Sequence, residues 1–186
     1  MEQIETFDLR ENGFAKFDPM ADGKTVIPDA PGNYVVVLRE DAFLPPINIE
    51  PIYTLVDFEG TLYRVIYIGS ASGSLRKRDY EQHFTKNNAG QSTLRKSLGS
   101  LMGFKKILRD KNKPENGKTK FGEADEATLS KWMQSKLLLF FKIDCNFKEA
   151  EKKLINELNP ALNIMSNANE INREYRKTLT ALRSSK

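Results

Sequence analysis

Hydrophobic and polar positions follow one another in blocks that predict strands early in the chain and mostly helices later. Runs rich in β-branched and aromatic residues predict strands at 34–38, 52–56, 62–68 and 137–143. Apolar residues spaced three or four apart predict helices at 75–84, 92–102, 148–158 and 169–184, and another that Asp125 would cap. The stretch 111–120 has no apolar residue and predicts a loop.

Two of these runs flank Asp57-Phe58-Glu59-Gly60, a turn sequence, and therefore predict an antiparallel hairpin. With helices following the strands, the pattern predicts an α+β fold with a small, mostly antiparallel central sheet flanked by helices. A length of 186 residues suits one globular domain rather than two full-sized ones.

Composition narrows the class of protein. Hydrophobic residues make up 39% of the chain, enough for a core, yet no apolar run approaches the roughly 20 residues that cross a bilayer. The N-terminus is acidic and lacks the apolar segment of a signal peptide, so we expect a soluble, cytoplasmic protein. A single cysteine and a single histidine exclude an internal disulfide and a His-rich zinc site.

Charge is distributed unevenly along the chain. Residues 1–70 carry a net charge of −7, residues 71–120 carry +9 and residues 121–186 carry +2. The basic middle block suits a polyanionic partner such as nucleic acid. A solvated basic surface explains the charge alone equally well.

Six residues stand at places where a side chain could do chemistry, near strand ends, on helices or after a proline. They are Tyr34, Tyr67, Arg78, His83, Glu151 and Asn163. Each has an ordinary structural explanation when taken singly, such as a packing tyrosine, a surface cation or a turn asparagine.

Together these residues resemble the motifs of the GIY-YIG nuclease family. Gly32-Asn33-Tyr34 and Tyr67-Ile68-Gly69 are similar to the two motifs that name the family, with Asn33 at a position where members vary. The segment 74–78 is similar to the helix motif that ends in an essential arginine, here Arg78. Glu151, Leu154-Ile155, Pro160 and Asn163 are similar to the final, metal-binding motif. All four occur in the family's order, as in stand-alone bacterial members.

The resemblance also implies a domain organisation. A nuclease-like domain would span 31–165, with insertions at about 40–62 and 92–135, after an N-terminal arm at 1–30 and before a C-terminal helix at 166–186. The interval from Arg78 to His83 is one residue longer than in phage homing endonucleases.

The activity implied by the resemblance is metal-dependent hydrolysis of phosphodiester bonds in DNA. Arg78 would bind the scissile phosphate, and a tyrosine would be the base; we favour Tyr34, with Tyr67 in support, although the sequence does not decide between them. His83 would relay a proton or contact phosphate, and Asn163 would orient the loop around Glu151. A single glutamate implies one divalent ion, Mg²⁺ with Mn²⁺ as a substitute, bound by Glu151.

The basic block supplies the expected DNA contacts to phosphates rather than to bases. The candidates are Arg76, Lys77, Lys86, Arg95, Lys96, Lys105, Lys106 and Arg109. Cutting both strands would call for a homodimer or two binding events. A catalytically silent nucleic-acid-binding module of the same fold is the alternative function, and RNA is a less favoured substrate than DNA.

Overall fold

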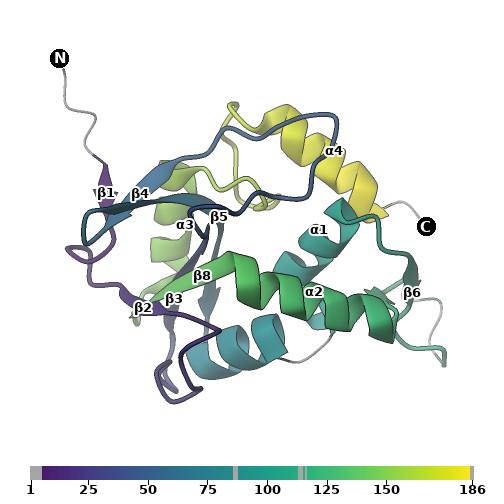
Figure 1. Ribbon diagram of the computed structural model, residues 1–186, viewed down its shortest axis with the longest axis horizontal. Coiled ribbons are helices and arrows are strands. Elements are labelled where there is room, and N and C mark those ends of the chain that lie inside the picture. Colours follow the sequence, from purple (N-terminus) through teal and green to yellow (C-terminus); the bar gives the residue numbers. More distant parts are fainter. Residues whose placement is uncertain (1–5, 86–87, 113–114, 116, 185–186) are drawn as a thin grey trace.

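The computed structural model describes residues 6–85, 88–112, 115 and 117–184, which form a six-stranded sheet, a two-stranded hairpin and the helices around them (Figure 1). The large sheet contains β1 (Phe7–Asp8), β2 (Ala15–Phe17), β3 (Gly32–Leu38), β4 (Leu55–Phe58), β5 (Thr61–Ala71) and β8 (Leu137–Ile143). The hairpin pairs β6 (Lys106–Leu108) with β7 (Thr119–Phe121). The helices are the π-helix η1 (Arg76–Thr85), the 3₁₀-helix η2 (Ala89–Gln91), α1 (Thr93–Leu101), α2 (Glu123–Lys136), α3 (Phe147–Leu158) and α4 (Arg173–Ser184). The predicted α+β class is confirmed.

The large sheet is antiparallel except at one edge. Its strand order is β1-β4-β5-β3-β8-β2, and only the β1–β4 pair is parallel. β3 lies between β5 and β8, which is why all seven of its residues are buried and why its sequence is continuously apolar after Asn33.

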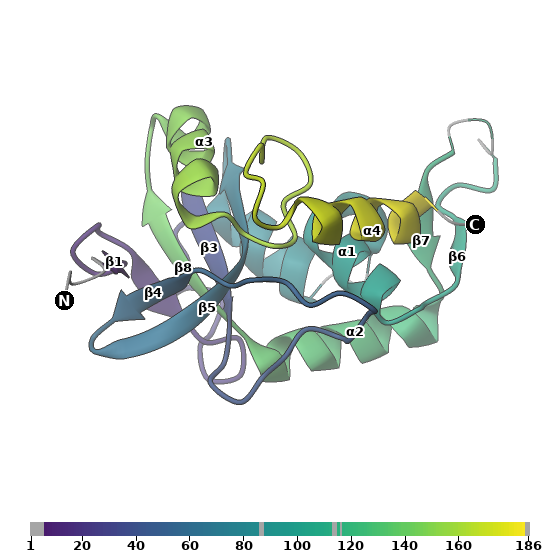
Figure 2. The same cartoon turned by 90° about the horizontal axis from the view of Figure 1, so that it is seen from above.

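Helices cover both faces of the sheet. Along β3, Tyr34, Val36 and Leu38 pack in the core cluster that contains residues of α1, α2 and α4, whereas Val35 and Val37 pack in the cluster that contains residues of α3. In Figure 2, α1, α2 and α4 lie together on the right, with β6 and β7 beyond them. The site therefore forms on a strand with helices on either side.

The structure differs from the predicted elements in segments whose hydrophobic pattern is weak. α2 begins at Glu123 after Gly122, so Asp125 lies in its first turn and the prediction that it caps the helix is wrong. The predicted loop at 111–120 is wrong at its end, because Thr119 and Lys120 pair with β6 in the hairpin. The N-terminal arm supplies β1 and β2, which pair with β4 and β8 at opposite edges of the sheet.

None of the helices in the described part of the chain combines the length and the apolar character needed to cross a bilayer.

Candidate active site

Gly32 and Gly69, the glycines of the two motifs, belong to strands. Neither forms a turn, and the missing side chain of each allows neighbouring atoms to pack closely. Tyr34 of β3 faces Gly69 of β5 in register, and a Cβ on Gly69 would lie 2.3 Å from the Tyr34 hydroxyl. A Cβ on Gly32 would lie 2.1 Å from the carbonyl oxygen of Lys142 on β8. The glycine at 69 therefore lets the ring of Tyr34 lie across the neighbouring strand.

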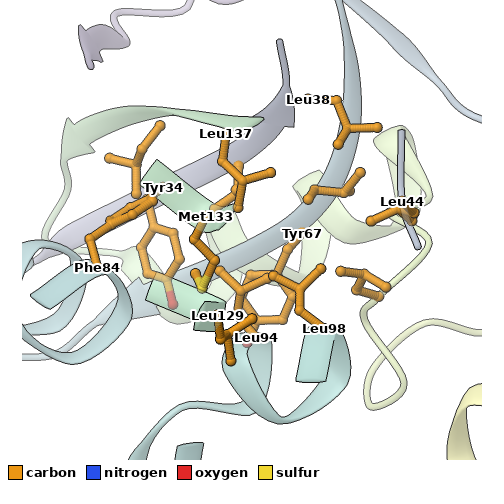
Figure 3. Packing of buried hydrophobic residues seen from close by; sticks show 14 of the residues in the cluster. Tyr34, Leu38, Leu44, Tyr67, Phe84, Leu94, Leu98, Leu129, Met133 and Leu137 are labelled. Carbon is orange, nitrogen blue, oxygen red and sulfur yellow. The ribbon is translucent and has the colours of Figure 1, made fainter. Parts of the chain in front are cut away.

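Tyr34 and Tyr67 are stacked neighbours on one face of the sheet. Their ring centroids are 6.2 Å apart with an interplanar angle of 29°. Figure 3 shows the two rings side by side among Leu94, Leu98 and Met133, which come from α1 and α2. The strands thus hold both phenols rigidly, as expected for aromatic residues on adjacent strands.

The π-helix η1 carries Arg78 and His83 toward the same phenol. Nε of Arg78 lies 3.4 Å from the Tyr34 hydroxyl, and Nε2 of His83 lies 2.9 Å from it. Hydrogen bonds in a π-helix run from residue i to i+5, which widens each turn by one residue relative to an α-helix. The π-helix therefore accommodates the long Arg78-to-His83 interval, because both side chains still reach Tyr34.

The hydrogen bonds around Tyr34 form a chain that runs through His83 to Ser92. Arginine can only donate, so the phenol oxygen accepts from Arg78. Nε2 of His83 is hydrogen-bonded to the Tyr34 hydroxyl, and Nδ1 is hydrogen-bonded to the Ser92 hydroxyl, 2.7 Å away. One ring nitrogen of the neutral histidine donates and the other accepts, so the tautomer sets the direction of both bonds.

Burial keeps this chain neutral. Tyr34 and His83 are both 0% exposed. Burial raises the pKa of the Tyr34 phenol well above its ordinary value. Burial, with the nearby cations Arg78 and Arg95, lowers the pKa of His83 well below its usual range. Both groups are uncharged at neutral pH.

Asp79 is a buried carboxyl group that the sequence did not single out. It is 0% exposed, and neither of its carboxyl oxygens has a hydrogen-bond partner among the described residues. Burial raises the pKa of Asp79 well above its ordinary value, and Arg78 only partly opposes that shift. One of its oxygens lies 3.9 Å from Nε2 of His83.

Glu151 reaches the end of β5 from α3. Its Oε2 accepts a hydrogen bond of 2.6 Å from the hydroxyl of Ser70, which directly follows the second motif. Glu151 and Tyr67 line the same cavity of about 370 Å³, and the Tyr67 hydroxyl lies 2.7 Å from Oγ1 of Thr93. A separate hollow of about 400 Å³ is lined by Ser70 and Arg78.

Asn163 completes the edge of β5 beyond the end of β4. Its Oδ1 accepts from the backbone N–H of Ile68 at 2.9 Å, and its Nδ2 donates to the Ile68 carbonyl at 2.8 Å. The side-chain amide thus replaces one peptide group of a missing neighbouring strand. Both ends of the amide are occupied, so Asn163 positions the strand next to Tyr67 and is not aimed at a ligand.

Asn33, the unusual residue of the first motif, ties the sheet to α3. Its Nδ2 donates to the carbonyl oxygen of Phe147, the first residue of α3, at 2.8 Å. This hydrogen bond, made by a buried side chain, helps to fix the helix that carries Glu151. A polar residue inside a buried strand was a usable signal for this role in the sequence.

The family model of the GIY-YIG catalytic domain matches residues 32–185. The chain belongs to the GIY-YIG family. No curated protein and no solved structure shows significant similarity to it. The match spans most of the chain, which confirms the family resemblance and supports a nuclease-type hydrolase acting on nucleic acid.

The GIY-YIG domain brings five of the six predicted site residues to one end of the β3–β5 pair. Arg78 and His83 contact Tyr34, Tyr67 stacks on Tyr34, and Glu151 shares a cavity with Tyr67. The sixth, Asn163, lines that cavity but makes only backbone contacts with its side chain. Ser70, Ser92 and Thr93 are partners that were not singled out from the sequence; Ser70 directly follows the second motif, and Ser92 and Thr93 are the first two residues of the helix predicted at 92–102.

Arg95 is not available for DNA contact, and its prediction as a phosphate ligand is wrong. The side chain is 0% exposed and lies between α1 and α2, where it forms an ion pair of 2.7 Å with Glu126. It also donates to the Ser130 hydroxyl and to the carbonyl oxygen of His83. A sequence pattern cannot reveal this burial, because Glu126 lies 31 residues away.

The other predicted DNA contacts differ in availability. Lys77 and Lys105 are exposed, and Arg109 is exposed while its Nη1 donates to the carbonyl oxygen of Gly90 at 2.9 Å. Arg76 donates to the carbonyl oxygen of Ile27, and Lys106 donates to that of Leu182 at the end of α4. Lys96 lines the cavity beside Glu151. Lys86 lies outside the described residues.

Proposed function

We propose that the protein is a metal-dependent endonuclease that hydrolyses phosphodiester bonds in DNA. The observation that carries this proposal is the shared cavity of Tyr67 and Glu151, together with Ser70, which bonds to Glu151 and lines a second hollow with Arg78. A phosphate placed over Ser70 would meet a carboxylate, a guanidinium and a phenol at once. That combination suits a reaction that depends on positioning and on stabilising phosphoryl charge.

The residues present fit a single magnesium ion. Oε1 of Glu151 has no hydrogen-bond partner in the described part of the chain, and that part contains no group of three or more histidine, cysteine, aspartate or glutamate residues that could hold a metal. Mg²⁺ characteristically keeps several waters and binds through one or two carboxylates plus substrate phosphate, and Mn²⁺ can replace it. When bound, the ion would supply stabilisation of negative charge on the phosphate and on the leaving oxygen.

Arg78 is the proposed ligand of the scissile phosphate. Its Nη1 is held by the side chain of Gln82 and by the carbonyl oxygen of Gln91. Its Nη2 has no hydrogen-bond partner among the residues the structure describes, and the guanidinium lines the hollow next to Ser70. A fixed guanidinium with an available N–H is well suited to a phosphate oxygen.

Burial favours Tyr67 over Tyr34 as the proton acceptor, the reverse of the assignment that the sequence suggested. The Tyr34 phenol is enclosed by Arg78, His83 and Gly69, whereas Tyr67 lines the cavity that contains Glu151. Burial raises the pKa of Tyr67, so the phenol is protonated at neutral pH. It would take a proton from the attacking water while donating its own to the Thr93 hydroxyl, and the exposed Thr93 would release its hydroxyl proton to solvent.

In this proposal Tyr34 and His83 position Arg78 rather than contact substrate. Their neutral hydrogen-bonded chain fixes Nε of Arg78 without adding a competing negative charge. The buried Arg95 supports this hydrogen-bonded chain. It is ion-paired with Glu126 and donates to the backbone carbonyl of His83.

A nicking assay tests the proposed activity. Supercoiled plasmid is incubated with the protein in Mg²⁺, in Mn²⁺ and in EDTA, beside single-stranded DNA and RNA of one sequence. We expect cleavage of DNA that depends on the metal. Binding without cleavage of any substrate would instead identify a catalytically silent module, and cleavage of RNA alone would reassign the substrate.

A further inference from the structure

The cavity beside Glu151 has a second wall that the family motifs do not describe. Lys96 of α1 and Arg183 of α4 line it together with Thr180 and Ser184. Arg183 does not belong to any of the four sequence motifs, and it lies near the end of α4. Glu151 and Tyr67 thus share their cavity with cations distinct from Arg78, which lines a separate hollow with Ser70.

Neither cation on this wall forms an ion pair with an acidic side chain in the described part of the chain, although the carboxyl group of Glu151 lines the same cavity. The ammonium of Lys96 makes no hydrogen bond or ion pair there. The guanidinium of Arg183 makes one long contact, 3.4 Å from Nη1 to the Ser97 hydroxyl. Partial burial and the nearby Arg183 and Lys106 lower the pKa of Lys96. Positive charges are therefore crowded at a place where an anion would be stabilised.

The wall is held in place by contacts at both ends of α4. Near its start, Nη1 of Arg176 donates to Oδ1 of Asn159, the residue that caps α3. Near its end, Nζ of Lys106 donates to the carbonyl oxygen of Leu182 at 2.6 Å. Along its length α4 packs against the core through Tyr175 and Leu179. Arg183 is therefore presented by a fixed helix.

The other residues that line the cavity suit a nucleotide. Apolar side chains of Ile155, Leu162 and Ile164 lie beside the hydroxyls and cations. A volume of about 370 Å³ with a mainly apolar lining and a few charged groups is characteristic of sites for small ligands. Ile155 and Leu162 are each only 1% exposed, so a sugar would contact the half-buried Ile164 while its phosphate faced Lys96 and Arg183.

We propose that Lys96 and Arg183 form a subsite for the phosphate next to the scissile one on the same nucleic-acid strand. The inference rests on the proposed function, since it takes Arg78 as the ligand of the scissile phosphate. It adds a second phosphate position in the cavity that Glu151 lines, apart from the hollow that Arg78 lines. The strand would then be held by two consecutive phosphates, with the bond to be cut between the two cationic positions.

The subsite is tested by competition binding, which does not depend on cleavage. Thymidine 3′,5′-bisphosphate and thymidine 5′-monophosphate each compete with a labelled oligonucleotide in the presence of EDTA, followed by fluorescence anisotropy. The bisphosphate can occupy both positions, so we expect it to compete about tenfold better than the monophosphate with wild type. We expect the double variant Lys96→Gln/Arg183→Gln to lose that advantage.

A matched control separates the subsite from general electrostatics. Lys177→Gln removes a charge from the exposed side of α4 and should leave the advantage of the bisphosphate unchanged. Arg183→Lys keeps the charge and should retain part of it. The inference is overturned if wild type shows no advantage, or if the folded double variant, checked by circular dichroism, keeps the full advantage. Absence of nuclease activity would overturn the proposed function but would leave this binding result intact.

Discussion

At the scale of single residues, burial separates two tyrosines that the sequence presents as equivalents. Both phenols are protonated at neutral pH, because burial raises the pKa of each. They differ in their partners. Tyr34 is bonded to His83 and Arg78 inside the protein, whereas Tyr67 is bonded to the exposed Thr93 at the edge of a cavity. Their proposed roles differ because Tyr67 lines a cavity and Tyr34 does not, and not because the pKa of only one of them is raised.

This difference predicts unequal effects of removing each hydroxyl. Tyr67→Phe removes the proposed proton acceptor and should lower kcat by about 100-fold or more, because general-base catalysis contributes on that order. Tyr34→Phe removes a positioning contact and should lower kcat by only about tenfold. Single-turnover cleavage of a labelled oligonucleotide measures both. A larger loss in Tyr34→Phe than in Tyr67→Phe would restore Tyr34 as the base.

Asp79 makes stability depend on pH. Its folded-state pKa is raised, so its contribution to stability is fully present below about pH 4 and is lost as pH rises toward the folded pKa. Asp79→Asn removes this titration. The variant should therefore gain stability relative to wild type as pH rises, by at most about 1.4 kcal/mol per pH unit.

Urea unfolding of both proteins at pH 5, 6.5 and 8 measures this difference. A free-energy difference that stays constant or falls across the series would mean that Asp79 is ionised and stabilised in the folded protein.

At the scale of elements, the sequence predicted best where a pattern is local. The strand at 137–143 is a continuous apolar run and the helix beginning near Ser92 has apolar residues at helical spacing, and both form within a residue of the prediction. β1 and β2 are only two and three residues long and exist because other strands pair with them. The π-helix η1 likewise carries no periodic signal that separates it from an α-helix.

The site, too, was predicted only in part. The resemblance to the family's motifs predicted that Tyr34, Tyr67, Arg78 and Glu151 belong to one site. It could not predict the partners of those side chains, such as Ser70 with Glu151, because the contact joins residues 81 apart in the chain. Long-range packing, rather than local propensity, decides such contacts.

The edge of β5 gives a prediction at this scale. Asn163→Ala leaves the N–H and C=O of Ile68 without partners and should cost about 2–3 kcal/mol of stability, since unpaired buried backbone groups are costly. The amide of Ile68 should also exchange faster with solvent. Asn156→Ala on the exposed face of α3 is the matched control. Equal stabilities and an unchanged exchange rate would contradict the strand-like role of Asn163.

At the scale of the whole molecule, the basic block predicted from charge divides into buried and exposed cations. Lys105 and Arg109 are exposed beside the β6–β7 hairpin, whereas Arg95 is enclosed between α1 and α2. Charge counted along a sequence cannot distinguish these positions. Only the exposed cations can release counterions from nucleic acid.

This division predicts two different phenotypes. Lys105→Gln/Arg109→Gln should keep the stability of the protein but reduce the slope of log Kd against log salt by about 1.8 for duplex DNA. Arg95→Gln should leave Glu126 buried without its ion pair and destabilise the fold by about 3–5 kcal/mol. Anisotropy titrations across salt concentrations and urea unfolding separate the two. An unchanged slope in the double variant would place the DNA elsewhere.

The central claim is that Glu151, beside Tyr67 and Ser70, is the metal-binding carboxylate of a nuclease site. Replacing Glu151 by Gln keeps the size of the side chain and one oxygen that can accept from Ser70 but removes the charge, and Glu149→Gln makes the same change on an exposed residue of α3. In a plasmid-nicking assay with Mg²⁺, Glu151→Gln should abolish cleavage while binding DNA as wild type does, and Glu149→Gln should cut normally. Cleavage by Glu151→Gln at the wild-type rate would contradict the account.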